Sequence, residues 1–289
     1  EICSRDWSSD VCSSDLTIDY DLQRIAEEML VNKHGAIVAL DPNNGEILAL
    51  ATGPDIDPNL FTGPNKKRNI YRLANDTIYD NKPTYDRSVQ AAYPPGSPFK
   101  LLTALAGYQM KVISDSTKFT CRHGYRMGRH TIGCHCGTYW PIGMEKAIEK
   151  SCNNYFSSVF YKITEKYGPK GRNRAIDEWK EIMNSFGLGE FMNNDLAVGA
   201  KGKIPSGEFY TKRLGEKWHP YESAIFNGMG QGDVLLTPLQ MANFTAAIVN
   251  RGWYFTPHIV KSIDGKPNPD PRFKNKHLTK VQNQKYYDL

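Results

Sequence analysis

The chain has 289 residues, of which 40% are hydrophobic and 23% are charged, and its formal net charge is +5. These proportions are those of an ordinary globular protein and exclude a chain that is disordered throughout. No apolar run approaches the roughly 18 residues that a membrane-spanning helix needs, and the longest basic cluster, Lys66-Lys67-Arg68, is too short to indicate a nucleic-acid partner.

The first sixteen residues differ in character from the rest. The stretch EICSRDWSSDVCSSDL contains a near-repeat and shows neither helical nor strand periodicity. It also lacks the charged start and the apolar core of a signal peptide. It resembles translated sequencing-adapter sequence, with a natural disordered tail as the alternative. We therefore expect residues 1–16 to be non-native and residues 17–289 to hold the folded domain.

The next part of the chain predicts a helix and then a β-hairpin. Residues 17–30 have the apolar spacing of an amphipathic helix. Two short apolar runs, residues 35–40 and 47–51, flank a connection rich in Pro, Asn and Gly, which is typical of a hairpin. Residues 53–92 are rich in Pro, Asn, Asp and Tyr, and they predict a long, partly irregular excursion.

Helices dominate the second half. The pattern predicts helices over about residues 144–166 and 174–186, and a third that has Thr237 as its N-cap and ends before Gly252. A strand is predicted for residues 254–261. Helices and strands interleave irregularly, which favours a mixed α+β fold over a repeated βαβ array.

Ser97 is the first candidate for chemistry. In the segment YPPGSPFK it begins a helix after a rigid Pro-Pro-Gly approach, and Lys100 follows three residues later, on the same helix face. A serine hydroxyl becomes a nucleophile when a base takes its proton, and a partly desolvated lysine amine can be that base. The alternative is a serine that only caps the helix beside a solvated lysine.

Ser151 and Asn153 form a second candidate motif, Ser-Cys-Asn, farther along the chain. A second hydroxyl can relay a proton to or from Lys100, and an Asn amide can hold both the lysine and a substrate amide. A purely structural serine before a helix is the alternative. Neither motif is specific alone, but their order and separation are informative.

This order of motifs is similar to that of penicillin-binding proteins and serine β-lactamases. Longer blocks resemble the class B penicillin-binding proteins, the monofunctional peptidoglycan transpeptidases, and especially their elongation-type penicillin-binding protein 2 subgroup. These blocks are TIDYDLQ, GAIVALDPNNGEILALAT, YPPGSPFK, AIEKSCNNYF and GMGQGDVLLTPLQMA. They extend over most of the chain after residue 16, so residues 17–289 are expected to be part of a transpeptidase domain.

The resemblance implies both a fold and a mechanism. The expected fold is that of penicillin-binding proteins and serine β-lactamases, an α+β fold with a helical part and an antiparallel sheet. Ser97 would be the acylated nucleophile, Lys100 its general base, and Ser151 and Asn153 the second motif, with Asn153 binding substrate. No cofactor is required for this chemistry.

The resemblance also implies partners and a location. The substrates would be peptidoglycan stem peptides ending in D-Ala-D-Ala, and β-lactam antibiotics would mimic them. A glycosyltransferase of the elongation machinery is the expected protein partner. The expected location is the periplasmic side of the bacterial inner membrane, reached through an anchor that this sequence does not contain.

The chain departs from the family in one respect, since it has no Lys-Thr-Gly or Lys-Ser-Gly, the family's third motif. We expect truncation at the C-terminus and a polypeptide that is catalytically crippled as it stands. A β-lactam sensor, a β-lactamase-like protein and a non-catalytic scaffold or zinc-binding module are the alternatives. The absence of a Glu-x-x-Leu-Asn pattern favours transpeptidation over β-lactam hydrolysis.

A cluster of cysteine and histidine lies between the two motifs. The segment CRHGYRMGRHTIGCHCG holds Cys121, Cys134, His135 and Cys136, which are candidate ligands for a structural zinc ion. The spacing is not that of a standard zinc finger, and a disulfide between Cys121 and Cys134 is the rival interpretation. Zinc held in this region by some members of the resembled subgroup favours the metal. Cys152 is predicted to be a small packed residue.

Overall fold

The structure is a computed structural model that describes residues 14–75, 82–137 and 140–288. The α-helices are α1 (Tyr20–Leu30), α2 (Lys66–Ala74), α3 (Lys100–Gln109), α4 (Met144–Glu149), α5 (Asn153–Thr164), α6 (Arg172–Ser185), α7 (Gly207–Leu214) and α8 (Pro238–Val249). The strands are β1 (Ser14–Leu16), β2 (Gly35–Leu40), β3 (Ile47–Gly53), β4 (Phe119–Thr120), β5 (Gly124–Met127), β6 (His130–Gly133), β7 (Pro141–Ile142), β8 (Trp253–Phe255), β9 (Val260–Ile263), β10 (Lys266–Pro267) and β11 (Lys276–Leu278).

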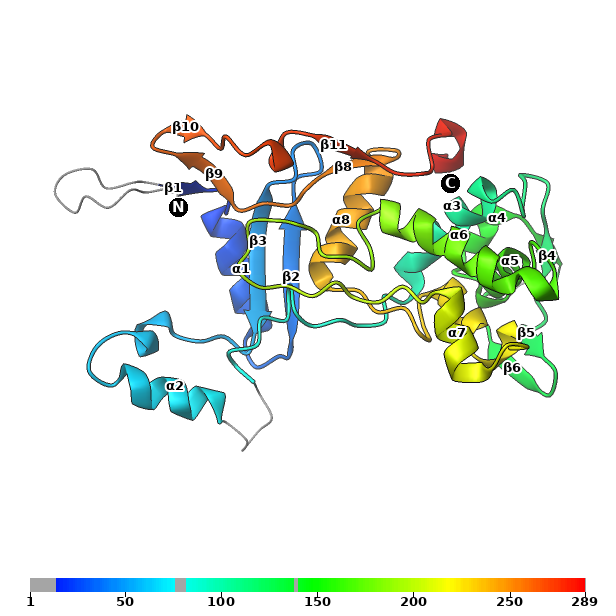
Figure 1. The fold of residues 1–289 in the computed structure, drawn as a ribbon, viewed down its shortest axis with the longest axis horizontal. Helices are drawn as coiled ribbons and strands as arrows, with labels where there is room; N and C mark the ends of the chain where they lie inside the picture. Colours follow the sequence, from blue (N-terminus) through cyan, green and yellow to red (C-terminus); the bar gives the residue numbers. More distant parts are fainter. Residues whose placement is uncertain (1–13, 76–81, 138–139, 289) are drawn as a thin grey trace.

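These elements form two parts that meet near the start of α3. Figure 1 shows a sheet-bearing part around β2 and β3, and a helical part made of α3 to α7. The strands pair in small antiparallel groups, β1–β9–β10, β8–β11, β2–β3, β4–β7 and β5–β6. The α+β class predicted from the sequence is therefore confirmed.

The β2–β3 hairpin is the framework of the first part. Its antiparallel register runs from Gly35 opposite Gly53 to Leu40 opposite Ile47, as the turn residues between the two apolar runs predicted. Alternate residues of β3 are buried, because successive side chains of a strand point to opposite faces. Helix α1 packs on β3 and α8 packs on β2, so the hairpin is covered by helices.

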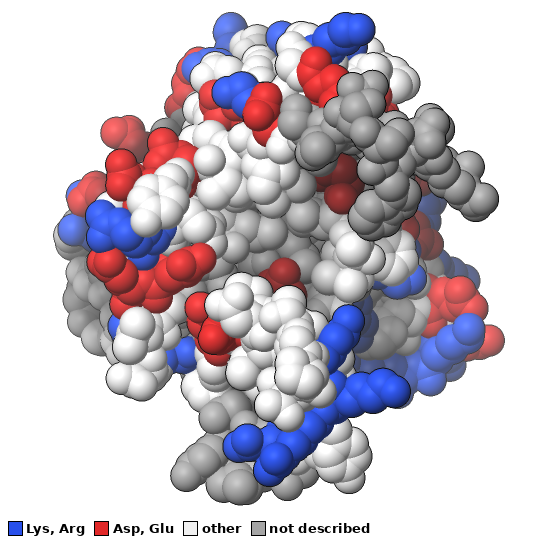
Figure 2. Space-filling model, turned by 90° about the vertical axis from the view of Figure 1, so that its left-hand side faces the viewer, with Lys and Arg blue, Asp and Glu red and all other residues white. Residues whose placement is uncertain are grey.

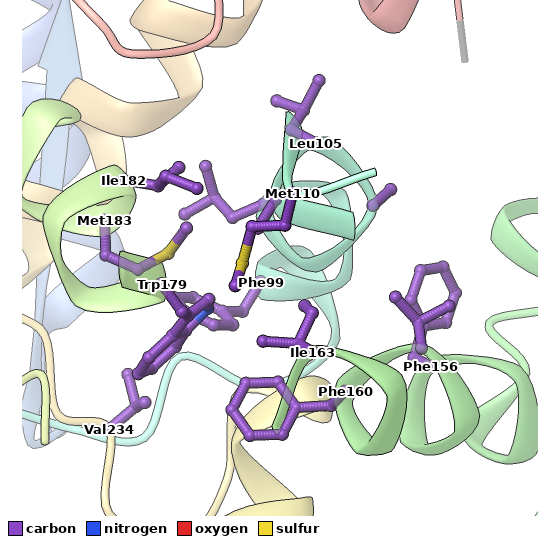
Figure 3. Packing of buried hydrophobic residues seen from close by; sticks show 14 of the residues in the cluster. Phe99, Leu105, Met110, Phe156, Phe160, Ile163, Trp179, Ile182, Met183 and Val234 are labelled. Carbon is purple, nitrogen blue, oxygen red and sulfur yellow. The ribbon is translucent and has the colours of Figure 1, made fainter. Parts of the chain in front are cut away.

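The core of the helical part consists of large aromatic and aliphatic side chains from α3, α5 and α6. Figure 3 shows Trp179 of α6 beside Phe99 and Phe160. The edge-to-face ring pairs have centroid distances of 6.4 Å to Phe99 and 5.1 Å to Phe160, and all three residues are fully buried. Such pairs add about 0.5–1.5 kcal/mol each to the effect of burial. Phe99 is therefore a firm anchor two residues after Ser97.

Helices α1, α6 and α8 agree with the predicted segments. Thr237 is the N-cap of α8, where its Oγ1 accepts a hydrogen bond from the Gln240 N–H at 3.2 Å. The Gln240 side chain accepts in return from the Thr237 N–H at 3.1 Å, which completes a capping box.

Two predicted elements are each broken in two. The helix expected over residues 144–166 is α4 and α5, which are separated by the second motif. The strand expected over residues 254–261 is β8 and β9, which pair with different partners. Pro257 lies between β8 and β9, and it has no N–H with which to continue a ladder.

The excursion predicted as irregular contains the additional helix α2. This helix stands away from the body in Figure 1, and Ile70 and Tyr71 are 39% and 71% exposed. The segment KKRNIYRLA has apolar residues at helical spacing, but they are few, and the polar residues around them favoured an irregular excursion in the prediction. It carries Lys66, Lys67 and Arg68, and in Figure 2 basic side chains cross the lower part of this face at the height of α2.

Part of the N-terminal stretch belongs to the fold. Residues 14–16, which the sequence analysis set apart, form β1 and pair with β9. The foreign origin of residues 1–16 stays a prediction, and residues 1–13 lie outside the described part. Among the described residues, no helix combines the length and the apolar character needed to cross a bilayer.

Candidate active site

Ser97 lies on a turn that is fixed from two sides. It begins the 3-10 turn Ser97–Phe99, which runs directly into α3, and it is exposed to solvent. The preceding Gly96 has a φ of 68°, and its N–H donates to the Gly230 carbonyl oxygen at 2.7 Å. Phe99 is completely buried. A solvent-facing hydroxyl is thus held between the core and a second backbone segment.

The second backbone segment is the glycine-rich stretch 228–232, to which sequence reasoning gave no role. Gly230 has a φ of 67°, and a Cβ at this position would lie 2.2 Å from the Gly96 carbonyl oxygen. The Gly228 carbonyl accepts a hydrogen bond from Thr103 of α3 at 3.0 Å. Glycine is required at position 230 because the backbone must approach the Ser97 turn so closely.

Lys100 is buried and makes three hydrogen bonds to the second motif. Its Nζ donates to the Ser151 carbonyl oxygen at 2.8 Å, to Ser151 Oγ at 2.8 Å and to Asn153 Oδ1 at 2.7 Å. Ser151 Oγ lies 3.1 Å from Ser97 Oγ, to which it donates. The structure therefore brings together all four predicted residues, and Lys100 is connected to Ser97 through Ser151.

Burial lowers the pKa of Lys100, because a charged amine loses its hydration in the protein interior. The thiols of Cys134 and Cys152 oppose this effect and would raise the pKa of Lys100 if they were ionised. Burial also raises the pKa of the Cys152 thiol, which keeps this thiol neutral as long as no cation is bound to it. Lys100 is thus closer to losing its proton than an exposed lysine, as a general base must be.

The second motif occupies the break between α4 and α5. Ser151 has a φ of 48°, which is uncommon for a residue with a side chain. Asn153 is the first residue of α5, and its Nδ2 donates to the Gly133 carbonyl oxygen at 2.9 Å while its Oδ1 accepts from Lys100. Apolar periodicity continues across this break, so the sequence predicted a single helix. In the structure the helix is interrupted at Ser151, where the second motif contacts Lys100.

A group of four buried cysteines lies directly beside the second motif. The sulfur atoms of its members are all within 4.8 Å of one another, and the members are Cys121, Cys134, Cys136 and Cys152. His135 is exposed and lies outside this group, whereas Cys152, which was not among the predicted ligands, belongs to it. The metal itself stays a prediction. The rival interpretation, a disulfide between Cys121 and Cys134, is wrong, since all four thiols are free.

Cys152, the fourth member of the cysteine group, was missed because it lies far along the chain from the other three. His135 lies between two buried cysteines, and neighbouring residues of an extended segment point to opposite sides. Cys152 comes from the start of α5 and was interpreted only as a packed residue. The number of cysteines left after residue 16, four, was the signal that could have indicated the correct group.

The cysteine group fits a tetrahedral zinc ion. Zn–S bonds of about 2.3 Å place the four sulfur atoms about 3.8 Å apart. The Sγ atoms of Cys134 and Cys152 are 3.7 Å apart. Burial and the neighbouring thiols raise the pKa of Cys121 to about 12, so a cation is needed to hold these groups as thiolates.

An exposed serine, a second hydroxyl and a buried lysine are hydrogen-bonded in series, which is the arrangement expected of a Ser-x-x-Lys site. Residues 35–286 match the family described as the penicillin binding protein transpeptidase domain. The chain belongs to this family, and the resemblance to class B penicillin-binding proteins is confirmed.

Curated relatives agree with this assignment. The peptidoglycan D,D-transpeptidase MrdA of Acinetobacter baumannii is 36% identical over 258 residues, which are 86% of this chain and 35% of the relative. MrdA of Escherichia coli K12 is 30% identical over 259 residues, 88% of this chain and 38% of the relative. The chain thus spans little more than a third of the length of these proteins.

Solved structures show the same fold. Penicillin-binding protein 2 (PBP2) of Pseudomonas aeruginosa, in complex with WCK 5153, has a TM-score of 0.79 and 32% identity over 96% of this chain and 60% of its own. A chain of a peptidoglycan synthase complex, solved to show the coordination of polymerization and crosslinking, has a TM-score of 0.79 and 28% identity, over 96% of this chain and 48% of its own. PBP2 in its complex with MreC from Helicobacter pylori has a TM-score of 0.72 and 27% identity, over 90% of this chain and 46% of its own.

Proposed function

We propose that the chain is the catalytic portion of a peptidoglycan D,D-transpeptidase that cross-links stem peptides through an acyl-Ser97 intermediate. The observation that carries this proposal is the continuous series of hydrogen bonds from Ser97 through Ser151 to Lys100. The names of the curated relatives favour transpeptidation over a β-lactam sensor, a β-lactamase-like protein or a non-catalytic scaffold.

Acylation follows from this geometry. With Lys100 neutral, the Ser97 proton passes to Ser151 Oγ while the Ser151 proton passes to Lys100 Nζ. Ser97 Oγ then attacks the carbonyl carbon of the penultimate D-Ala, an ester forms, and the peptide bond to the terminal D-Ala breaks. The departing amine takes back a proton along the same route, and free D-Ala leaves.

The second half of the reaction uses the same groups. An amine of a neighbouring stem peptide attacks the ester and gives a proton to neutral Lys100. The peptide bond forms, the ester bond to Ser97 breaks, and Ser97 Oγ receives that proton from Lys100 through Ser151. The Asn153 side chain would form a hydrogen bond with the substrate amide while its Oδ1 accepts one from Lys100 Nζ. β-Lactams would acylate Ser97 in the same way and leave slowly, because their ring-opened product has no departing D-Ala to make room for an amine.

Labelling of the full gene product with a fluorescent penicillin tests the proposal. We expect one covalent adduct, mapped by mass spectrometry to the peptide that holds Ser97, and its loss in Ser97→Ala. Labelling that persists in this variant contradicts the proposed nucleophile. Release of the label within seconds indicates a β-lactamase, since a transpeptidase holds it far longer.

We also propose a structural zinc ion at the four-cysteine group. Its ligands would be Cys121, Cys134, Cys136 and Cys152, whose sulfur positions fit the tetrahedral geometry. The ion would fix the four thiolates in place and keep them from oxidation. Metal analysis of the purified chain is expected to give one zinc per chain.

The partners and the location belong to the same proposal. The relatives solved in a synthase complex and with MreC support a peptidoglycan glycosyltransferase and other elongation proteins as partners. The substrate lies outside the cytoplasm, so we place the catalytic part on the periplasmic side of the bacterial inner membrane. Co-purification of the full gene product with its neighbours after cross-linking in cells tests this placement.

A further inference from the structure

The β5–β6 hairpin and its flanks carry positive charge without any acidic residue. Between Asp115 and Glu145 the sequence has four exposed basic residues and no Asp or Glu. The basic residues are Lys118, Arg122, Arg126 and Arg129. Within the described part of the chain none of them forms an ion pair, whereas Arg172, Arg213 and Arg251 each pair with a carboxylate. The charge of this segment is therefore open to a partner.

The strand register places Arg126 on the outer face of the hairpin, which lies at the end of the helical part in Figure 1. On the inner face Met127 is buried, and the Tyr125 ring packs edge to face on a second tyrosine with a centroid distance of 6.1 Å. Successive residues of a strand point to opposite faces, so Arg126 points outward, opposite Thr131. Gly133 is two residues from Thr131 and belongs to the same exposed face.

This outer face is connected to the acyl-transfer groups through one residue. The Gly133 carbonyl oxygen accepts a hydrogen bond from Asn153 Nδ2 at 2.9 Å, and Asn153 Oδ1 accepts one from Lys100 Nζ at 2.7 Å. Two residues of an antiparallel strand span about 7 Å, so the backbone at Arg126 is about that far from the carbonyl that holds Asn153. An unpaired arginine thus lies close to the second motif but outside the chain of proton transfer.

The chemistry of the guanidinium group indicates what this face can bind. Its planar fork donates two parallel hydrogen bonds to a carboxylate or a phosphate. An extended peptide covers about 3.3–3.6 Å per residue, so three or four residues bridge roughly 10–14 Å. A peptide whose reacting carbonyl lies at Ser97 therefore has the length to reach the hairpin with a residue that precedes the broken bond.

We propose that the outer face of the β5–β6 hairpin, with Arg126 as the contacting residue, is a subsite for a carboxylate of the peptide substrate that lies away from the bond that breaks. The identity of the peptide rests on the proposed function, and the subsite adds the sign of the charge that this peptide must carry. Arg122 and Arg129 raise the positive potential around Arg126. The contact is made equally before and during the reaction, so it lowers KM and leaves kcat unchanged.

Binding of two matched peptides by the full gene product tests the subsite. Both peptides end in D-Ala-D-Ala and carry the same fluorescent group, but the carboxylates upstream of that end are free in one and amidated in the other. Fluorescence anisotropy should give a Kd about threefold to tenfold lower for the carboxylate peptide, and Arg126→Gln should abolish this difference. The control Arg68→Gln removes the same charge from the exposed helix α2 and should keep the difference.

Three results of the binding experiment overturn the proposal. The first is an equal Kd of the unaltered protein for the two peptides, and the second is no measurable binding of either peptide. The third is an equal loss in Arg126→Gln and Arg68→Gln, which would show that only the overall charge of the protein matters.

Vesicles of phosphatidylglycerol distinguish a peptide from a membrane surface, because a guanidinium group also binds phosphate. We expect the 289-residue chain and its Arg126→Gln variant to bind these vesicles equally. Vesicle binding that is lost in Arg126→Gln but kept in Arg68→Gln would make the hairpin a membrane contact and would refute the peptide subsite.

Release of D-Ala from the two peptides gives the catalytic readout. For the carboxylate peptide, Arg126→Gln should raise KM about threefold to tenfold and change kcat less than about twofold. A lower kcat at an unchanged KM would refute a binding role. If the unaltered protein neither labels with penicillin at Ser97 nor releases D-Ala, the proposed function fails, while the anisotropy measurements still decide whether Arg126 binds a carboxylate.

Discussion

Replacement of Gly230 by alanine is the sharpest test of how the Ser97 turn is held. A Cβ at position 230 would lie 2.2 Å from the Gly96 carbonyl oxygen and 2.6 Å from Phe99 Cβ, and neither neighbour is the flexible end of a side chain. The φ of 67° also places the new residue in the left-handed region. The backbone of the Ser97 turn must therefore move.

The magnitude follows from two contributions. A left-handed alanine costs about 1–2 kcal/mol, and overpacking of a close contact adds about 1–3 kcal/mol. We expect Gly230→Ala to lower the free energy of unfolding by about 2–5 kcal/mol. The matched control is Gly128→Ala, with a φ of 58° and open space around the added Cβ, which should lose only the first contribution.

Urea denaturation of the three proteins measures the stabilities, and penicillin labelling of the corresponding full gene products measures the effect on Ser97. A shift of the turn of about 1 Å is expected to slow labelling up to about a hundredfold in Gly230→Ala, with Gly128→Ala unaffected. If the two variants lose equal stability, the close approach at Gly230 contributes nothing. If Gly230→Ala is destabilised but labels at the normal rate, the turn does not depend on this contact.

Three further changes test single interactions. Because burial lowers the pKa of Lys100 from its usual 10.5, the rate of labelling by penicillin should increase as the pH rises through this lowered pKa. Lys100→Arg should label much more slowly, and its rate should not increase over the same pH range, because arginine keeps its proton. By the same shift, the unfolded chain binds more protons between the two pKa values, so the contribution of Lys100 to stability increases with pH across that window. Asp233→Asn removes the charge that Ser223 and Arg213 contact, and it should lower the free energy of unfolding, measured by urea denaturation, by about 2 kcal/mol. The loss is no larger because Arg213 is half exposed, which weakens its ion pair with Asp233. A loss below about 0.5 kcal/mol would show that these contacts do not stabilise the fold. Thr237→Ala should cost about 1 kcal/mol through loss of the α8 cap, and equal midpoints for the two chains would contradict that role.

The parts of the site that sequence could predict are those fixed by local spacing. Ser97 and Lys100 are three residues apart at a helix start, so one turn determines their relation. The capped helix α8 and the β2–β3 hairpin are also determined by neighbouring residues. In each case the signal and the structure that it predicts lie within one short segment.

The parts that sequence missed depend on contacts between distant segments. The break between α4 and α5 is held by hydrogen bonds from Lys100, about fifty residues away, whereas the apolar pattern of the sequence runs on across it. The choice of Cys152 over His135 likewise depends on how the β5–β6 hairpin lies against α5. The split between β8 and β9 was visible locally in Pro257, but their partners were not.

The middle position of the Ser-x-Asn motif explains how one segment can serve two sites. Ser151 and Asn153 both turn toward Lys100, so the residue between them must point away from the acyl-transfer groups. In this chain that residue points into a pocket of three other cysteines. A cysteine at this position therefore joins the cysteine group without displacing either neighbour, whereas another residue at position 151 or 153 would remove a hydrogen bond to Lys100. The contacts that fix the outer two residues of the motif leave the middle one free to pack against another segment.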